Sequence, residues 1–438
     1  MALSRRQFIG RAGLFGIAAV APLQALYARP ARAQSFTVAG FGPLVPDPAG
    51  ILDLPAGFTY RSLSSRGETM SDGTLVASGH DGMATFRGKG ATTILIRNHE
   101  LSPTSSTAVV APNGQTYDPL CKGGTTTLVI APGPERQLVS HYTSLAGTYR
   151  NCAGGPTPWG SYITCEEDTS TPATTSTVSA FHGYNFEVPR LAPGAVTPVP
   201  LVAMGRFNHE AIAVDPATGI VYQTEDRGDS LFYRFIPTQP RNLAAGGVLE
   251  AMRIVGQPQV NTKNGFPVNQ VFQVDWVRID EPNPATDTVR AEGFSKGAAL
   301  ISRGEGAFYA NGEIYFVSTN GGTASRGQVW RYIPGATAAE GGTIELFTEP
   351  NNSAILDGPD NIVVAPFGDL LLMEDGSSTQ FVVGVTPQGG LYQFARNAAS
   401  TSEFAGGCFS PDGETFFVNV QSPGVTFAIW GPWANRVS

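Results

Sequence analysis

The stretch LDGPDNIVVAPFGDLLLMEDG, residues 356–376, contains two short apolar strands on either side of a Gly/Asp turn. Asp360 stands at the start of the first strand, and Glu374 and Asp375 stand at the end of the second. In an antiparallel hairpin the start of one strand lies beside the end of the next. The three acids are therefore expected at one edge of a sheet, where like charges repel unless a cation lies between them.

The same pattern recurs along the chain. Each copy runs from a polar start through two apolar strands to a polar cluster and an aromatic third strand. The copies cover residues 208–237, 304–334, 358–396 and 406–432, with partial copies at 92–100 and 161–189. Such a recurring three- or four-stranded unit predicts an all-β fold, a β-propeller of about six blades. A β-sandwich, or a pair of them, also gives evenly spaced hairpins, but the matched aromatic third strands favour the propeller.

Composition agrees with an all-β fold. The 438 residues include 52 glycines and 33 prolines, and only 15% are charged, as expected for short strands joined by turns. No low-complexity linker divides the chain, so residues 34–438 are expected to form one propeller domain.

The N-terminal residues read as a targeting segment. Arg5 and Arg6 precede an apolar stretch at residues 14–26, and the small-residue site ARA follows at 31–33. Residues 1–33 are therefore predicted to be a cleaved signal peptide of the twin-arginine type, whose partner is the twin-arginine export machinery. An ordinary secretory signal or a lipid-facing anchor is the alternative. We expect a periplasmic or extracellular monomer that is not stably inserted in a membrane after cleavage.

Charge argues against nucleic-acid binding. Removing residues 1–33 removes five of the 28 basic residues and none of the 36 acids, which leaves 23 against 36, a balance of −13. Such a chain attracts neither nucleic acid nor an anionic membrane.

The repeats predict a metal site at one mouth of the propeller channel. If the repeated hairpins are the inner strands of successive blades, their polar ends surround a single channel mouth. So many carboxylates cannot stay ionised together without cations. The metal-ligating candidates are Glu100, Cys165, Glu166, Glu210, Asp226, Glu305, Asp360, Glu374 and Asp375.

The residue types limit which metal could bind. Carboxylates are hard ligands that suit Ca²⁺, whereas the thiolate of Cys165 favours iron, zinc or copper. The alternative for Cys165 is a buried apolar cysteine or one half of a disulfide. Only five histidines are present, which argues against a zinc hydrolase built on histidine ligands.

Arg303 stands two residues before Glu305 and is the leading candidate for binding an anion at this negative rim. Arginine can hold a phosphate by two parallel hydrogen bonds, although Arg303 could instead form an ion pair that holds Glu305. Metal ions lower the pKa of bound water and shield a phosphate ester, so no protein nucleophile is needed. Accordingly, the chain shows no evident Ser-His-Asp spacing. Arg303 and Glu305 are the catalytic candidates.

An ordered series of motifs resembles the PhoX-type alkaline phosphatases, of which this chain would be a shorter member. The motifs are NCAGGPTPWGSYITCEED, FNHEAIAVDP, TEDRGDSLFYRF, SRGEGAFYANGEIYFVST, GPDNI, MEDG and GGCFSPDGETFFVNVQSPGVTFAIWGPW. The resemblance implies a six-bladed propeller with an iron (Fe³⁺) and calcium (Ca²⁺) cluster at one channel mouth. It implies hydrolysis of small phosphorylated substrates, phosphate monoesters or also diesters, by a metal-activated oxo or hydroxo nucleophile outside the cytoplasm.

The resemblance also implies roles for single residues. Cys165 would be an iron ligand, Glu210 and Glu305 would lie beside the metals, and Arg303 would contact the phosphate. Two other functions stay open at this point: a calcium-dependent, lactonase-like propeller hydrolase, and a non-catalytic binding propeller in which metal only joins the blades.

Overall fold

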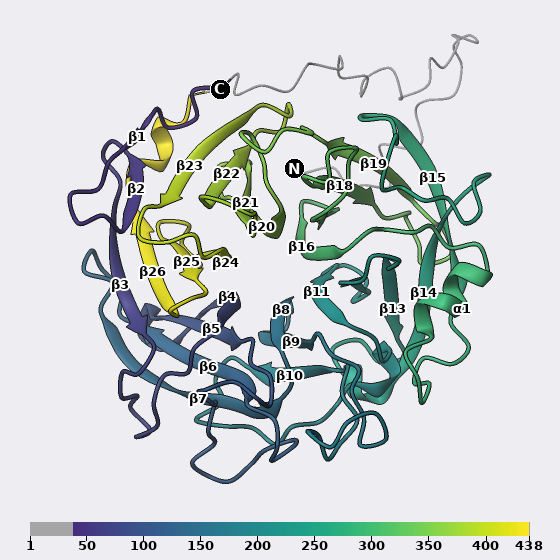
Figure 1. The fold of residues 1–438 in the computed structure, drawn as a ribbon, viewed down its shortest axis with the longest axis horizontal. Coiled ribbons are helices and arrows are strands. Elements are labelled where there is room, and N and C mark those ends of the chain that lie inside the picture. Colours follow the sequence, from purple (N-terminus) through teal and green to yellow (C-terminus); the bar gives the residue numbers. More distant parts are fainter. Residues whose placement is uncertain (1–37, 438) are drawn as a thin grey trace, which may run out of the picture. The chain divides into compact units, whose positions relative to one another are not determined.

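The structure is a computed structural model that describes residues 38–437. The expected signal peptide, residues 1–33, lies outside the described residues. The described chain is all-β and resembles a propeller, with antiparallel meanders arranged in a ring (Figure 1). Side chains of the innermost strands line a channel at its centre. The strands form five sheets, of nine, six, four, four and three strands.

Each meander starts at the channel and runs outward (Figure 1). In chain order the meanders are β4 (His80–Arg87), β5 (Thr93–His99), β6 (Gly123–Ile130) and β7 (Leu138–Thr148); β8 (Asn151–Pro156), β9 (Ser161–Glu166) and β10 (Asn185–Pro189); β11 (His209–Val214), β12 (Val221–Glu225), β13 (Tyr233–Pro237), β14 (Gly247–Ile254) and β15 (Val271–Arg278); β16 (Gly304–Ala310), β17 (Glu313–Ser318), β18 (Gln328–Ile333) and β19 (Thr343–Thr348); β20 (Pro359–Val364), β21 (Leu370–Glu374), β22 (Phe381–Val385) and β23 (Leu391–Asn397); and β24 (Phe404–Phe409), β25 (Phe416–Val420) and β26 (Val425–Trp430).

Pairings at the outer edges connect these meanders to the rest of the chain. β15 pairs with β19, which joins two meanders into the nine-stranded sheet. β3 (Thr59–Ser65) pairs with β26, so the first part of the described chain completes the last meander. β1 (Leu44–Val45) and β2 (Leu52–Pro55) extend the sheet of β23. The ring is thus closed by residues from both ends of the described chain.

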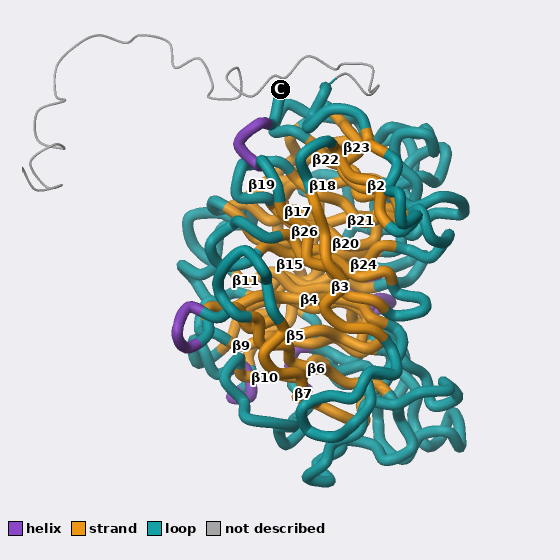
Figure 2. The backbone as a smooth tube through the Cα atoms, turned by 90° about the vertical axis from the view of Figure 1, so that its left-hand side faces the viewer, coloured by secondary structure: helices purple, strands orange, loops and turns teal. Residues whose placement is uncertain are grey.

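Helical structure is sparse. α1 (Val289–Ser295) is a short α-helix, and 3-10 turns occur at Lys89–Ala91, Val202–Met204, Leu243–Ala245 and Trp433–Asn435. Within residues 38–437, no helix is long and apolar enough to cross a membrane. Seen from the side, the strands run through the middle and loops lie on either side of them (Figure 2).

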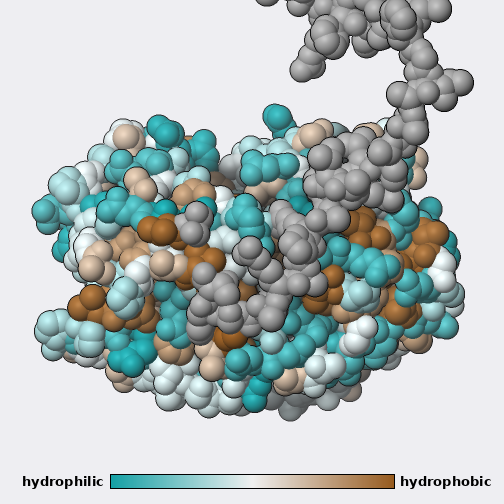
Figure 3. Space-filling model, turned by 90° about the horizontal axis from the view of Figure 1, so that it is seen from above, coloured by the Kyte–Doolittle hydropathy of each residue, from teal (hydrophilic) through white to brown (hydrophobic). Residues whose placement is uncertain are grey.

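The core is a series of apolar clusters between neighbouring sheets rather than one central mass. In one cluster Phe232, which follows β12, stacks on Phe316 of β17 with ring centroids 4.2 Å apart. The aromatic third strands found in the sequence supply Trp330 and Tyr332 to the same cluster. The outer surface in Figure 3 is mixed, with hydrophobic patches scattered among hydrophilic residues. Apolar packing between sheets therefore holds the ring together.

We predict that Phe232→Ala lowers the free energy of unfolding by about 3–5 kcal/mol, because it leaves a cavity between two packed meanders. Phe232 has no exposed surface, whereas Val139 is 61% exposed and serves as the control. Val139→Ala is expected to change the free energy of unfolding by less than about 0.5 kcal/mol. Equilibrium urea unfolding measures the free energy of unfolding of both variants. Equal changes in the two variants would show that this cluster does not stabilise the ring.

Candidate metal centre and active site

The innermost strands form a closed ring. β4 contacts β8, and the contacts continue through β11, β16, β20 and β24 back to β4. In each of these strands the pairing with the second strand of the meander shifts register once. A β-bulge bends its strand and redirects a side chain. The first residues within these shifts are Asp81, Cys152, Glu210, Glu305, Asp360 and Gly406.

Further acids follow the second strands. The residue directly after the second strand is an acid in four meanders: Glu100, Glu167, Asp226 and Asp375. Each donates its backbone N–H to a carbonyl oxygen just before the bulge of the first strand, at distances of 2.7–3.1 Å. These hydrogen bonds extend the ladder to the channel mouth. The second strands therefore deliver their acids beside those of the bulges.

The two sets of side chains line one pocket at the channel mouth, which we call the acidic pocket. It is lined by Asp81, Glu100, Arg150, Cys152, Glu167, Glu210, Asp226, Arg303, Glu305, Asp360, Asp375, Glu403 and Gln421. Of the residues expected from the sequence, the structure brings seven together in this pocket. They are Glu100, Glu210, Asp226, Arg303, Glu305, Asp360 and Asp375.

Three expected residues, Cys165, Glu166 and Glu374, are not in the acidic pocket. Cys165 is fully buried in an apolar cluster between sheets. The Glu166 carboxylate instead accepts a hydrogen bond from His182 Nδ1 at 2.7 Å. Glu374 accepts the backbone N–H groups of Asp357 and Phe381 at 2.8 and 3.0 Å.

The alternation of side chains along a strand explains these differences. Successive side chains of a strand point to opposite faces, so only one of two adjacent acids can reach the channel mouth. In both acidic pairs the second member lines the pocket, Glu167 rather than Glu166 and Asp375 rather than Glu374. The thiol in the pocket belongs to Cys152, not Cys165. All four cysteines are buried and free.

The sequence interpretation missed Asp81, Arg150, Cys152, Glu167, Glu403 and Gln421. A local signal could have found two of them. The tripeptides HDG (80–82) and NCA (151–153) match HEA (209–211) and GEG (304–306), with a small residue after each pocket residue. That residue must be small because a Cβ atom on Gly82 would lie 2.6 Å from the Cα atom of Ala153 on the next inner strand.

Two arginines flank the acidic pocket in equivalent positions. Arg303 Nε and Nη2 donate to the two carboxylate oxygens of Asp226 at 2.8 Å, and Nη2 also reaches Glu305 at 2.9 Å. Arg150 Nη2 contacts Glu100 and Glu167, each at 2.7 Å. Each arginine stands two residues before its bulge residue, with φ of 48° and 49°. This left-handed conformation is uncommon for a non-glycine residue and is typical of functional sites.

Burial and crowding raise the pKa values of the pocket acids. Burial first, and neighbouring carboxylates second, raise the pKa values of Glu210 and Glu305 well above their ordinary value. The same causes raise the pKa of Asp360 to about 7. Asp81 shows a similar shift, and its buried Oδ1 atom has no hydrogen-bond partner. Charged carboxylates in such a place need a cation to balance them.

The donor set fits metal ions. Ligand atoms of Cys152, Glu167 and Glu210 lie within 4.8 Å of one another, and so do those of Glu210, Glu305 and Asp360. The first group joins a soft thiol to carboxylates, and the second is made of carboxylates alone. A transition metal suits the first group and calcium the second.

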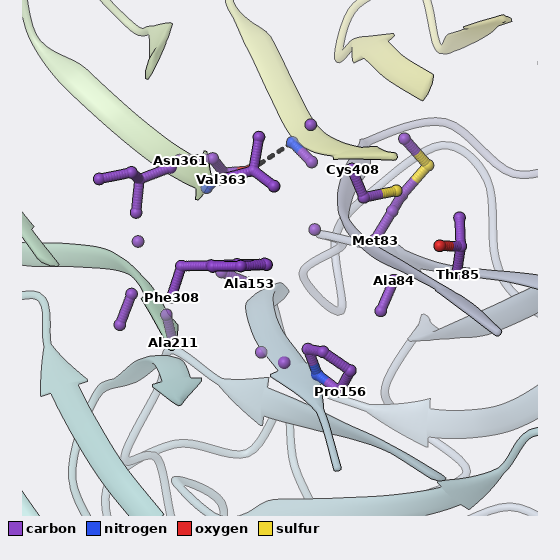
Figure 4. A pocket seen from close by; sticks show the side chains of 18 of the residues that line it. Met83, Ala84, Thr85, Ala153, Pro156, Ala211, Phe308, Asn361, Val363 and Cys408 are labelled. Atoms are coloured by element: carbon purple, nitrogen blue, oxygen red, sulfur yellow. Dashed lines mark hydrogen bonds between the residues drawn. The ribbon is translucent and has the colours of Figure 1, made fainter. Parts of the chain in front are cut away.

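Beyond the acidic pocket the channel is apolar. Side chains of the inner strands line it, among them Met83, Ala153, Phe308, Val363 and Cys408 (Figure 4). The residues that line this part of the channel include Thr85 and Asn361 but no charged side chain, and this less polar interior strengthens the electrostatic interactions at the mouth.

Comparison with solved structures shows the fold. The Pseudomonas fluorescens PhoX in complex with vanadate, a transition state analogue, aligns with a TM-score of 0.69 and 19% identity, covering 91% of this chain and 98% of that one. A Xanthomonas campestris gluconolactonase aligns with a TM-score of 0.44 and 12% identity, covering 89% and 98%. No curated protein matches the chain in sequence.

A family model provides the assignment. The model described as alkaline phosphatase PhoX matches residues 39–424, nearly the whole described chain. The matched range includes every inner strand and every residue of the acidic pocket. The chain therefore belongs to the PhoX alkaline phosphatase family and is a phosphoric ester hydrolase.

Proposed function

We propose that this protein is an exported phosphatase that hydrolyses phosphate monoesters at an iron–calcium centre in the acidic pocket. The observation that carries the proposal is the convergence of buried carboxylates and one thiol between two arginines at a single channel mouth. Each meander counts as one blade, which makes residues 34–438 a six-bladed propeller domain. Small phosphorylated substrates, the class that the family implies, fit a pocket in which arginine and metal ions meet.

Cys152, Glu167 and Glu210 would hold iron, and Glu210, Glu305 and Asp360 would hold calcium, with the remaining pocket acids completing both sets. The thiol supports this division, because it is the one soft donor among hard oxygens. When bound, the ions supply Lewis acidity that activates water and shields the charge of the ester.

Arg303 would bind the phosphate. Its side chain is 39% exposed, so a substrate can reach it, and the bidentate hydrogen bonds with Asp226 fix the direction of its guanidinium group. The hydrogen bond with Asp226 raises the pKa of Arg303 above its ordinary value, so the group stays a cation. Glu305 forms an ion pair with Arg303 and is also one of the three acids that would hold calcium. It would therefore position the arginine relative to the metal. A relative that binds vanadate, the Pseudomonas fluorescens PhoX, supports an oxyanion in this pocket.

Export by the twin-arginine route, to the periplasm or the medium, fits an enzyme whose metal centre is filled before the folded chain crosses the membrane. The proposal for residues 1–33 rests on the Arg5–Arg6 pair and the small-residue site at 31–33.

The overall test is turnover. The purified protein is expected to release phosphate from a chromogenic phosphate monoester, and to act more slowly on the matching diester and on a lactone. Faster hydrolysis of the lactone, or metal binding without any turnover, would contradict the proposal.

The first variant test distinguishes two cysteines. We predict that Cys152→Ser lowers the iron content to background and removes visible absorption, because the iron group loses its soft ligand. Cys165→Ser should keep both, since Cys165 lies in the apolar cluster. Elemental analysis and visible spectroscopy measure the outcome. Iron loss in Cys165→Ser alone would instead assign the ligand role to Cys165.

The second test concerns Arg303. Arg303→Met should weaken inhibition by inorganic phosphate about 10–100-fold, as expected for the loss of charge-assisted hydrogen bonds of about 1.5–3 kcal/mol. The control is Arg326→Met, because Arg326 forms an ion pair with Asp357 outside the acidic pocket. Inhibition constants measure the effect. If both variants bind phosphate like the parent, Arg303 only positions Glu305.

The third test removes metal. Chelation should abolish turnover and lower the thermal midpoint, because the pocket carboxylates then repel one another without a cation. Adding Ca²⁺ at about 100 times its dissociation constant should restore about 2.7 kcal/mol of stability. Differential scanning calorimetry with and without Ca²⁺ checks this. A thermal midpoint that does not change when Ca²⁺ is added would show that Ca²⁺ does not neutralise the charge of the pocket carboxylates.

A further inference from the structure

A second group of metal-ligating side chains lies outside the acidic pocket, between two long loops. Asp118 and Cys121 belong to the loop that joins β5 to β6, and His182 belongs to the loop that joins β9 to β10. One ligand atom from each of these residues lies within 4.8 Å of the others. Asp118 and His182 have no exposed surface, and Cys121 is 7% exposed.

The spacing of these atoms fits a tetrahedral ion. His182 Nε2 lies 3.4 Å from Cys121 Sγ and 3.2 Å from Asp118 Oδ2. Zinc binds sulfur at about 2.3 Å and nitrogen or oxygen at about 2.0–2.2 Å, so its ligands stand about 3.3–3.6 Å apart at tetrahedral angles. The two measured separations are close to the edges of such a tetrahedron.

The imidazole of His182 is already oriented for metal binding. Its Nδ1 atom donates to Glu166 Oε1 at 2.7 Å. Glu166 is in turn held by the backbone N–H groups of Tyr149, Gly183 and Tyr184 at 2.9–3.2 Å. A carboxylate on one ring nitrogen fixes the proton there and leaves the other nitrogen free to bind a metal. Here that free nitrogen is Nε2, which faces Asp118 and Cys121.

Asp118 is fixed in the same way. Its carboxylate accepts the backbone N–H groups of Leu120, Ser179 and Ala180 and the hydroxyl group of Ser179. This ionised group, the Cys121 thiol and the Nε2 atom of His182 all converge on one point. A proton on Nε2 can be donated to Asp118 or to Cys121, whereas a divalent cation bonds to all three groups at once.

We propose that Asp118, Cys121 and His182 bind a zinc-type divalent ion, with Glu166 as the positioning residue for His182. The mixed nitrogen, sulfur and oxygen set suits zinc, and water takes the fourth position. Cys121, the one ligand with exposed surface, marks the side from which an ion enters. The loops joined by this ion begin beside Glu100 and Glu167 of the acidic pocket, so the ion holds that side of the channel mouth in place.

The experiment must separate this site from the acidic pocket, which also contains a thiol. Cobalt(II) serves as the probe, because it takes zinc sites and its bond to a thiolate absorbs in the near ultraviolet. In Cys152→Ser the remaining cobalt–thiolate absorption should come from Cys121. The double variant Cys152→Ser/Cys121→Ser should lose this absorption and bind one cobalt fewer per chain. Cys152→Ser/Cys408→Ser is the control, since Cys408 lines the inner channel and belongs to neither group of ligands, and it should keep both.

A second variant protects the test against misfolding. In the Cys152→Ser background, Glu166→Gln should weaken cobalt binding about 10–100-fold, as for other residues that orient a metal-bound histidine. At saturating cobalt it should reach the same thiolate spectrum. Circular dichroism checks that each variant is folded. Equal cobalt uptake and spectra with and without Cys121 would overturn the proposal and assign the cluster to an ion pair between protonated His182 and its acids.

Discussion

Electrostatic repulsion among buried carboxylates is the constraint on which this structure depends. Glu210, Glu305 and Asp360 come from three different meanders, yet their carboxylates lie within a few ångströms at one channel mouth. Burial first, and repulsion from neighbouring carboxylates of the acidic pocket second, raise their pKa values. Such an arrangement costs stability in the absence of cations, since each group is both desolvated and next to like charge. Its persistence in the fold is therefore best explained by the ions it would bind.

The bulges of the inner strands create this crowding. A regular strand would alternate its side chains between the two faces of its sheet, whereas the register shift turns one side chain toward the channel mouth. The residue that follows is glycine or alanine in five of the six inner strands, because the neighbouring inner strand passes close by, as Gly82 and Ala153 show. In β20 it is Asn361 instead. At the corresponding place in the last meander stands Gly406, and the acid comes from Glu403 instead. Packing between sheets and chemistry at the mouth are thus set by the same few positions.

Much of the fold could be predicted from the sequence, because hairpin periodicity is a local property. The strands at 209–225 and 359–374 fall within the repeats read from the sequence. The pairing of β3 with β26 could not be predicted, since it joins distant segments without a local pattern. The acids of the first strands were found because Glu210, Glu305 and Asp360 open their strands. Which member of Glu166–Glu167 or Glu374–Asp375 faces the pocket depends on the strand register, which a sequence alone leaves open. The sequence interpretation also named Cys165 rather than Cys152 as the metal ligand, because the register that decides which side chain faces the pocket is not visible in the sequence.

The most direct test of the central claim is anomalous X-ray scattering from crystals of the protein purified from its natural source, recorded above and below the iron edge. The account predicts an iron peak among Cys152, Glu167 and Glu210, with calcium-type density beside Glu305 and Asp360. An acidic pocket that holds only water, with its carboxylates turned away from one another, would contradict it.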